Sequence, residues 1–288
     1  MRKGELKINK NSKNVVNKSV YFVGIGGIGI SALAQWYLSE GWGVSGTDIA
    51  RSEIARMLKK CGAIIFNFPA FSKESISPPV GGSINGLTIT EFSKRKEKIK
   101  QYIKRADRLI YSTAVPESDW ELRYGKKIGK KIFSYPEALG ELTKKYKTIC
   151  VSGTHGKSTT TAMLALIMIK AGMDPTVILG TKMKEFVTNE VRPHSVLNEV
   201  GPRSYTGNNF RKGKSEWLLI EADEYKAAFL NYSPQMIVLT NIDKDHMDYY
   251  KDMGHIVGTY KKYIKKLPRN GTLIFNGDDE NVRRIFAK

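Results

Sequence analysis

The stretch "ICVSGTHGKSTTTAML" (residues 149–164) decides the fold class, because its pattern changes in the middle from that of a strand to that of a helix. Apolar residues open it and predict a buried strand, whereas the part from Lys157 onward is typical of a helix. Between the two lies a short loop that contains Gly153 and Gly156. A strand that passes through a glycine loop into a helix is the opening of a parallel α/β unit.

The loop "GTHGKS" (residues 153–158) is a candidate phosphate-binding loop, although Val151 stands where the usual motif has its first glycine. The two glycines allow successive backbone N–H groups to surround phosphate oxygens. Lys157 would reach the β- and γ-phosphates, and Ser158 would offer its hydroxyl to Mg²⁺. The alternative is that residues 159–161 only cap and start a helix. A lysine in the first turn opposes the helix dipole unless an anion is present, so we expect phosphate binding.

Later strands in the same half end in polar residues. "WLLIEADE" (residues 217–224) places Glu221 at the carboxyl end of a strand, where it can serve as a hard oxygen ligand for Mg²⁺. "VLTNIDKDHMD" does the same for Asn241, Asp245 and His246. A lone histidine is usually structural or solvated. Its position after a parallel strand, near a phosphate loop, favours a functional role.

The first half carries a second glycine motif, "GIGGIG" (residues 24–29), at the end of the strand pattern 19–26 and at the start of a helix pattern, 28–41. Such glycines let the backbone turn tightly and approach a diphosphate at the helix N-terminus. Asp48 ends the next strand, about twenty residues on, where a ribose-binding acid is expected. Alone, this half predicts NAD. The motif indicates only that a diphosphate binds, so a UDP-sugar fits as well as NAD. The structural alternative is a glycine turn that merely packs a helix on a sheet.

The alternation of strands and helices predicts an α/β fold with parallel sheets and helices on both faces. We expect a Rossmann-like N-terminal domain at 1–146, followed by a P-loop ATPase-like central domain at 147–288. Residues 69–88 are rich in Pro, Gly and Ser and predict a surface insertion, and residues 188–213 show no period and predict a mobile loop. The strand patterns lie at 19–26, 43–48, 63–68, 108–115, 148–153, 215–223 and 235–243, and residues 131–147 predict a further short strand followed by a helix.

Composition narrows the class of protein. The formal net charge is +19, which is compatible with nucleic-acid binding, but the lysines are scattered over helix patterns without any nucleic-acid-binding motif. Cys61 and Cys150 are far apart, so neither a disulfide framework nor a zinc site is indicated. The longest apolar run, residues 163–169, is far shorter than the roughly 20 residues of a membrane span. We expect a cytoplasmic protein that binds neither nucleic acid nor membrane.

Seven motifs in fixed order resemble the Mur ligase family: "GIGGIG", "SGTD", "YSTAVPES", "GTHGKSTTT", "EADEY", "TNIDKDHMD" and "NGDDENVR". The resemblance spans residues 19–288. It implies an ATP-dependent amide-forming ligase of peptidoglycan precursor synthesis, and thus a role in cell-wall biogenesis, cell shape and division. The nearest members join L-alanine to UDP-N-acetylmuramate through an acyl phosphate. The first domain would then bind the UDP-sugar rather than NAD, and the second ATP and Mg²⁺.

The resemblance also implies roles in the ATP half. Lys157 would hold the transferring phosphoryl group, Ser158 and Glu221 one Mg²⁺, and His246 a second metal ion, with His155 completing the catalytic set. Asn276 would contact adenine. The implied ATP-binding residues are Gly153, Thr154, His155, Gly156, Lys157, Ser158, Thr159 and Asn276.

For the UDP-sugar, the resemblance implies that the glycine motif cradles the diphosphate and that Asp48 and the turn at 112–114 lie near the uridine. Asn209 and Arg211 match a family segment near the reacting groups. The implied residues are Gly24, Gly26, Gly27, Ile28, Gly29, Asp48, Ser112, Thr113, Ala114, Asn209 and Arg211.

Three features depart from the family pattern. Lys226 stands where relatives have an acid, and "FNFPAF" (residues 66–71) lacks a Gly-His pair of the family. The chain stops at Lys288, whereas family members continue into a third domain that binds the amino acid. We therefore expect this domain to be absent or separately encoded as a partner, and the chain alone to form no amide bond.

Three alternatives stay open. A related ligase attaches a whole recycled peptide to the same sugar nucleotide, and the sequence does not separate it from the alanine-adding type. A binding module that has lost catalysis would hold UDP-sugar or ATP only. A dehydrogenase is the most distant alternative, because it leaves the phosphate loop unexplained.

Overall fold

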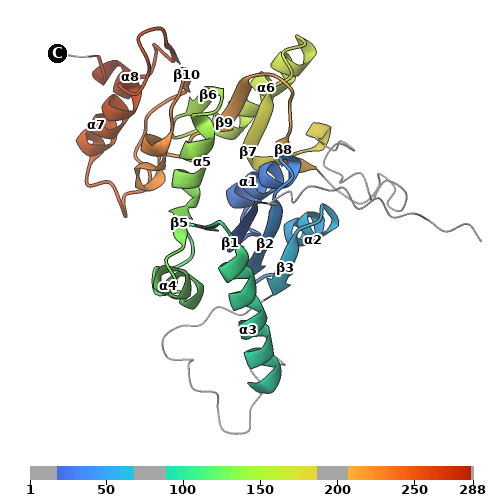
Figure 1. Ribbon diagram of the computed structural model, residues 1–288. Coiled ribbons are helices and arrows are strands. Elements are labelled where there is room, and N and C mark those ends of the chain that lie inside the picture. Colours follow the sequence, from blue (N-terminus) through green and yellow to red (C-terminus); the bar gives the residue numbers. More distant parts are fainter. Residues whose placement is uncertain (1–17, 68–88, 187–206, 287–288) are drawn as a thin grey trace, which may run out of the picture.

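The computed structural model describes residues 18–67, 89–186 and 207–286, and it contains two β-sheets with helices packed on them (Figure 1). The first sheet has the strand order β3-β2-β1-β4-β5, and all its neighbouring strands are parallel. The strand order reverses at β1, so the glycine motif lies at the switch point where doubly wound sheets bind ligands. The strands are β1 Ser19–Val23, β2 Gly43–Asp48, β3 Ile64–Asn67, β4 Arg108–Tyr111 and β5 Lys131–Ser134.

Polar caps fix where several helices of this first unit begin. The Ser52 side chain accepts the N–H of Ala55 at the start of α2, and Asp119 caps α4 in the same way. Ser134 and Glu137 form a reciprocal capping box at the start of α5. The helices are α1 Ile28–Ser39, α2 Glu53–Lys60, α3 Ile89–Arg105, α4 Trp120–Lys127 and α5 Tyr135–Thr143.

The second sheet has the order β11-β10-β6-β9-β7-β8, and it is parallel except for the edge strand β8, which runs antiparallel to β7. The phosphate loop leaves β6, which has β10 and β9 as neighbours. The elements are β6 Lys147–Ser152, α6 Lys157–Lys170, β7 Thr176–Met183, η2 Lys184–Phe186, β8 Asn208–Arg211, β9 Trp217–Glu221, η4 Tyr225–Asn231, β10 Met236–Leu239, α7 Met253–Ile264, β11 Thr272–Phe275 and α8 Glu280–Arg284.

Helices cover both faces of the second sheet because alternate residues of its strands point to opposite sides. Ile149 and Val151 of β6 belong to a core cluster with Ala165 of α6. Cys150 lies between them in sequence and joins the other cluster, together with Tyr263 of α7. The near-continuous apolar run of β6 therefore reflects burial on both faces.

Helix α1 connects the two sheets. It packs against β2 of the first sheet and against β7 and β8 of the second. One core cluster accordingly runs from Phe22 in β1 through Trp36 in α1 to Ile178 in β7 and Phe210 in β8. The helix that follows the first glycine motif is thus also part of the second unit's core.

The expected α/β class, with parallel sheets flanked by helices, is confirmed. One expectation for residues 188–213 was wrong in part, because 208–211 form the strand β8. Isolated from its partner β7, this short segment shows no clear period, and the pairing with β7 decides its structure. Residues 188–206 of that stretch and the expected insertion at 69–88 lie outside the described residues. The domain boundary at residue 146 stays a prediction. Among the described helices, none is both long and apolar enough to cross a bilayer.

Candidate functional site

The loop between β6 and α6 has a backbone that only glycine adopts easily. Gly153 has a φ of +131° and Gly156 a φ of +80°. A Cβ atom on Gly153 would lie 2.1 Å from Thr240 Oγ1 and 2.9 Å from the carbonyl oxygen of Asn241. The first glycine of the loop is therefore required both by its dihedral angle and by the close approach of the chain after β10.

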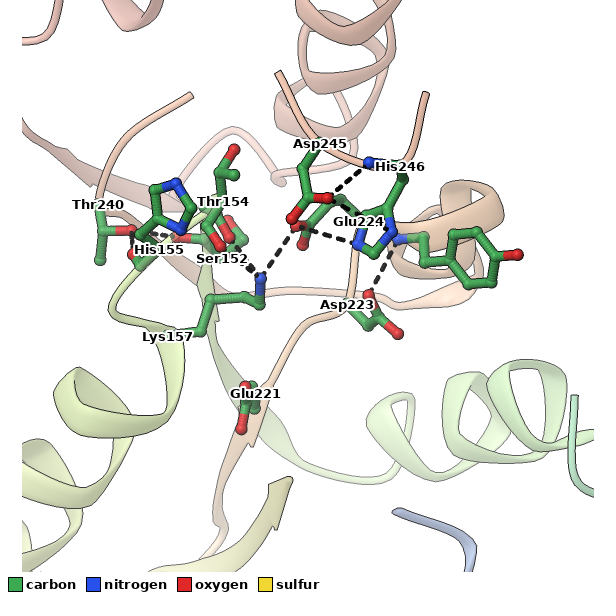
Figure 2. A network of polar contacts seen from close by, with 12 residues as sticks. Ser152, Thr154, His155, Lys157, Glu221, Asp223, Glu224, Thr240, Asp245 and His246 are labelled. Carbon is green, nitrogen blue, oxygen red and sulfur yellow. Dashed lines mark hydrogen bonds and ion pairs between the residues drawn. The ribbon is translucent and has the colours of Figure 1, made fainter. Parts of the chain in front are cut away.

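The chain after β10 holds the loop in place. The Thr154 N–H donates to the Asn241 carbonyl at 3.1 Å, and the His155 N–H donates to Asn241 Oδ1 at 2.8 Å. Thr240 Oγ1 donates to the His155 carbonyl at 2.7 Å (Figure 2). Asn241, which we expected near the site from its position after a strand, thus acts on the loop backbone.

The loop leads into the N-terminus of α6, whose first N–H groups have no partner within the helix. Lys157 lies at this end, and its Nζ donates to the Gly153 carbonyl at 2.7 Å, to the Thr154 carbonyl at 3.1 Å and to Glu224 Oε1 at 2.9 Å. Figure 2 shows the lysine ammonium group between the loop and Glu224. A helix N-terminus with a lysine beside it provides the donors and the positive charge that a polyphosphate requires.

Ser158 and Glu221 meet next to this loop, as a shared metal site requires. Ser158 Oγ donates to Glu221 Oε1 at 2.8 Å, and the Gly180 N–H donates to Glu221 Oε2 at 2.9 Å. A Cβ on Gly180 would lie 2.8 Å from that same oxygen, so glycine lets the carboxylate approach β7. A hydroxyl and a carboxylate beside a phosphate loop are ligands that suit Mg²⁺.

A second group of potential ligands comprises Asp223, Glu224 and His246, whose ligand atoms lie within 4.8 Å of one another. His246 Nε2 is 3.9 Å from Glu224 Oε1, and the histidine ring lies 4.7 Å from that of Tyr225. Burial raises the pKa of the Glu224 carboxyl, and the neighbouring Lys157 charge opposes that rise. Our sequence reasoning did not single out Asp223 and Glu224. The signal for them was the run of acids directly after β9.

The first glycine motif is held by the end of β2. Asp48 Oδ2 accepts the N–H of Gly26 at 2.6 Å, and its Oδ1 accepts the N–H of Ala50 at 2.8 Å. The Thr47 carbonyl accepts the N–H groups of Gly24 and Ile25. A Cβ on Gly26 would lie 2.7 Å from Asp48 Oδ2. Asp48, expected near a ribose, therefore also fixes the shape of the glycine loop.

Most of the other residues expected at the UDP-sugar lie around the first glycine motif. Ser112 follows β4 beside the glycine loop, since its Cβ would lie 3.1 Å from a Cβ on Gly24. Gly27 caps α1 without a side chain, and a Cβ on Gly29 would meet Tyr135 at 2.9 Å. These positions, with Ile28, Thr113 and Ala114, lie around the carboxyl ends of β1 and β4.

Asn209 and Arg211 in β8 have partners within the protein. Asn209 is buried, donates to the Ile28 carbonyl and to Ser31 Oγ of α1, and accepts from Gln35 Nε2 at 3.1 Å. Arg211 instead forms an ion pair with Asp174 at 2.5 Å. Asn209 thus lies at the start of α1, near the glycine motif, whereas Arg211 contacts Asp174 and Pro175, just before β7 begins.

Asn276, expected at the adenine, follows β11 and accepts the N–H of Asp278 at 3.0 Å. Thr159 lies in the first turn of α6, after the loop. Both stay predictions as ligand contacts.

A pocket of about 240 Å³ lies between the two units. Thr113 and residues 134–137 line it from the first unit, and Asp223, Tyr225 and Lys226 line it from the second. Lys226 has a φ of +50° and Ala227 a φ of +56°, an uncommon conformation for residues with a side chain. The pocket therefore joins the acidic cluster after β9 to the region beside the first glycine motif.

Comparison with known proteins adds independent findings. Residues 19–147 match the family model described as "Mur ligase family, catalytic domain", and residues 151–288 match "Mur ligase middle domain". The UDP-N-acetylmuramate–L-alanine ligase of Clostridium perfringens is 33% identical over 272 residues, which cover 94% of this chain and 49% of that protein. The enzyme of the same name from Clostridium botulinum strain Hall is 34% identical over 273 residues, with the same coverage. The chain spans about half the length of these curated relatives.

Two solved structures are similar in fold. UDP-N-acetylmuramate-alanine ligase MurC of Thermotoga maritima has a TM-score of 0.67 and 25% identity, and covers 93% of this chain and 51% of that one. The UDP-N-acetylmuramate:L-alanyl-gamma-D-glutamyl-meso-diaminopimelate ligase from Neisseria meningitides has a TM-score of 0.72 and 22% identity, and covers 93% and 74%. At that identity the second supports the fold alone.

Proposed function

Because the chain belongs to the Mur ligase family, we propose that it binds Mg·ATP and UDP-N-acetylmuramate and serves the joining of L-alanine to that sugar nucleotide. The observation that carries the proposal is the contact of Ser158 with Glu221 beside Lys157, at the end of a strand-loop-helix unit. A phosphate loop, a lysine and a hydroxyl–carboxylate pair are the parts that phosphoryl transfer needs.

The reaction follows from the groups involved. A carboxylate does not accept an amine in water, because its leaving group would be an oxide. Transfer of the γ-phosphoryl group of ATP to the carboxylate gives an acyl phosphate, from which the amine displaces phosphate to form the amide. Such a transfer depends on positioning and on neutralising oxygens more than on covalent chemistry of the protein.

The residues of this chain divide that work. The N–H groups at the start of α6 would bind phosphate oxygens, and Lys157 would leave Glu224 to follow the γ-phosphoryl group. Ser158 and Glu221 would hold one Mg²⁺ and His246 a second. The ions would neutralise the charge that develops on the phosphate oxygens. Asn276 would lie at the adenine.

In the first unit, the glycine motif would bind the diphosphate of the UDP-sugar at the N-terminus of α1. Asp48 and the turn at 112–114 would lie near the uridine. Asn209 links β8 to the first turn of α1, so it would align the two nucleotide sites through the protein rather than through the ligand. The names of the Clostridium relatives support L-alanine as the added group.

Calorimetry tests the ATP site. We expect Lys157→Ala to weaken Mg·ATP binding by roughly a hundredfold, about 2.8 kcal/mol, because it removes the cation nearest the phosphates. Lys170→Ala, at the other end of α6, is the matched control and should bind normally. Equal affinities of both variants and wild type would remove this loop as the nucleotide site.

Mass spectrometry tests the ligase. The chain is incubated with Mg·ATP, UDP-N-acetylmuramate and either L-alanine or L-alanyl-γ-D-glutamyl-meso-diaminopimelate. Each mixture is run with and without the C-terminal half of the Clostridium perfringens relative. We expect the alanine adduct to dominate in the mixtures that contain the added half, and no adduct in the mixtures without it. A dominant peptide adduct would assign the chain to the peptide-adding ligases, and no adduct in any mixture despite binding of both nucleotides would favour a non-catalytic binding module.

A further inference from the structure

We infer that Glu121 is a positioning residue for the diphosphate site of the first unit, which it reaches through Thr47. The neutral carboxyl group of Glu121 leaves the glycine loop at 24–29 suited to an anion, and the ionised group weakens anion binding there. The inference rests on the proposed function for the identity of the ligand. It gives a role to a buried acid that lies outside the seven sequence motifs of the resemblance.

Thr47, near the end of β2, contacts both the acid and the loop. Its Oγ1 lies 2.9 Å from each oxygen of the Glu121 carboxyl group. Its carbonyl oxygen accepts the N–H of Gly24 at 2.9 Å and the N–H of Ile25 at 3.0 Å. The side chain of Thr47 therefore faces α4, which carries the acid, while its backbone holds the glycine loop. A change in the acid reaches the loop through this single residue.

The acid is buried without a cation to balance it. Glu121, Thr47 and Tyr21 are each at most 3% exposed, and the Tyr21 hydroxyl of β1 donates to Glu121 Oε2 at 2.6 Å. Among the described residues Glu121 forms no ion pair, and the charged group that acts on it is Asp119, at the start of α4. A buried carboxylate without a cation is costly, so such a group binds a proton instead.

The surroundings of Glu121 place its ionisation within reach of a titration. Burial raises the pKa of the Glu121 carboxyl to about 8, the hydrogen bond from Tyr21 opposes that rise, and the Asp119 charge adds to it. Helix α3 presents the apolar Ile99 and Ile103 to the same cluster, and β2 contributes an uncharged hydroxyl. The carboxyl group therefore changes from neutral to ionised in mildly alkaline solution.

Ionisation of Glu121 acts on the loop in two ways. The new charge lies behind a loop that would hold a diphosphate, and like charges repel strongly where little water screens them. An ionised carboxyl group also binds the Thr47 hydroxyl more tightly, which pulls on the strand end that holds Gly24. Because a bound diphosphate makes ionisation of Glu121 more costly, affinity is highest below the pKa of the free protein. It falls as the pH rises through that pKa.

Calorimetry of UDP-N-acetylmuramate binding to the full chain, from pH 6.5 to pH 9, tests the inference. We expect the affinity of wild type to fall by about fivefold over this range. Glu121→Gln keeps an uncharged group of the same shape and should flatten the profile, whereas the exposed control Glu117→Gln should behave like wild type. Tyr21→Phe should move the fall to higher pH, because it removes a hydrogen bond that favours the ionised acid. A purely structural role of Glu121 would change stability without moving this profile.

A second readout needs no ligand. In the ¹⁵N-labelled chain, the amide signals of Gly24 and Ile25 should shift with pH in wild type and stay constant in Glu121→Gln. The amide of Gly156, in the second loop, serves as the control and should not follow this titration. Urea unfolding shows that the compared variants are folded.

Equal pH profiles of wild type and Glu121→Gln, in affinity or in the amide signals, would overturn the inference, and so would an affinity that rises with pH. Absence of UDP-sugar binding at every pH is a different result. If the Gly24 and Ile25 amides still titrate with Glu121, it would fail the proposed function and leave the link between the acid and the loop standing.

Discussion

The molecule contains two glycine loops of the same plan. Each connects the end of a parallel strand to the N-terminus of a helix, but the side chains that hold the two loops differ in charge. In the first, the carboxylate of Asp48 binds the Gly26 N–H. In the second, the amide of Asn241 binds the His155 N–H, and Lys157 lies within the loop. An acid serves as anchor in one loop, and a neutral amide with a lysine in the other.

The difference indicates what each loop is suited to bind. A carboxylate that already occupies one loop N–H limits the negative charge that the first loop can accept, which fits a diphosphate bound chiefly through backbone groups. The second loop concentrates positive charge, which fits a triphosphate whose terminal group must be stabilised during transfer. The predictions below test whether these loops depend on their anchors in the way the structure indicates.

The largest effect is expected at Gly153. A Cβ there would lie 2.1 Å from Thr240 Oγ1, and the φ of +131° is strained for any other residue, so Gly153→Ala should cost on the order of 3 to 5 kcal/mol. Gly156→Ala is the control, because its Cβ would meet nothing within 4 Å and only the left-handed backbone costs about 1 kcal/mol. Urea unfolding compares the two, and similar losses would contradict the claim of close contact with the chain after β10.

Thr47 connects the first glycine loop to a buried acid, because its carbonyl accepts N–H groups of the loop and its hydroxyl contacts the acid. Glu121 accepts hydrogen bonds from Tyr21 and Thr47, and burial raises its pKa to about 8. Since the unfolded value is near 4.5, the folded state binds the extra proton between these pH values, and stability falls as pH rises through that window. We expect wild type to lose on the order of 3 kcal/mol between pH 5 and pH 8.5.

Unfolding by urea at both pH values measures this loss. Glu121→Gln keeps a neutral group in the same place and should flatten the profile, while the exposed Glu117→Gln should leave it unchanged. A profile for Glu121→Gln as steep as that of wild type would assign the pH dependence to other groups.

A smaller effect is expected from Asp48→Asn. The amide keeps one acceptor but loses the charge that strengthens the bonds to Gly26 and Ala50, so we expect UDP-sugar affinity to fall by about 1 to 2 kcal/mol. ATP affinity should not change. Fluorescence competition with a labelled UDP probe measures the first and calorimetry the second. Tighter UDP-sugar binding would mean that the Asp48 charge opposes the diphosphate more than it orders the loop.

Much of this architecture was visible in the sequence because it rests on local signals. The apolar run before Gly153 predicted a strand, and the glycine motif after β1 predicted a tight turn. The sequence placed Asp48 near a ribose, and its contact with the Gly26 N–H came only from the structure. The α/β class followed from the alternation of strand and helix patterns. Residues such as Glu221 and Asn241 were found because the carboxyl ends of parallel strands collect at one edge.

The features that were missed depend on contacts between distant residues. Asn208–Arg211 becomes a strand only through pairing with β7, and Asn209 is occupied by α1, which is far from it in sequence. Glu224 gained its importance from Lys157, which lies 67 positions earlier in the chain. A pattern within a short window carries no information on such pairs, and the folded structure supplies it.

The central claim is that the two loops bind two different phosphate ligands at once. The most direct measurement is calorimetric titration of one sample with UDP-N-acetylmuramate and then Mg·ATP, repeated in the reverse order and with NAD added to a sample already saturated with the sugar nucleotide. We predict one site per chain for each nucleotide, with neither displacing the other, and no displacement of the UDP-sugar by NAD. Mutual displacement of the two nucleotides, or displacement of the UDP-sugar by NAD, would contradict this account.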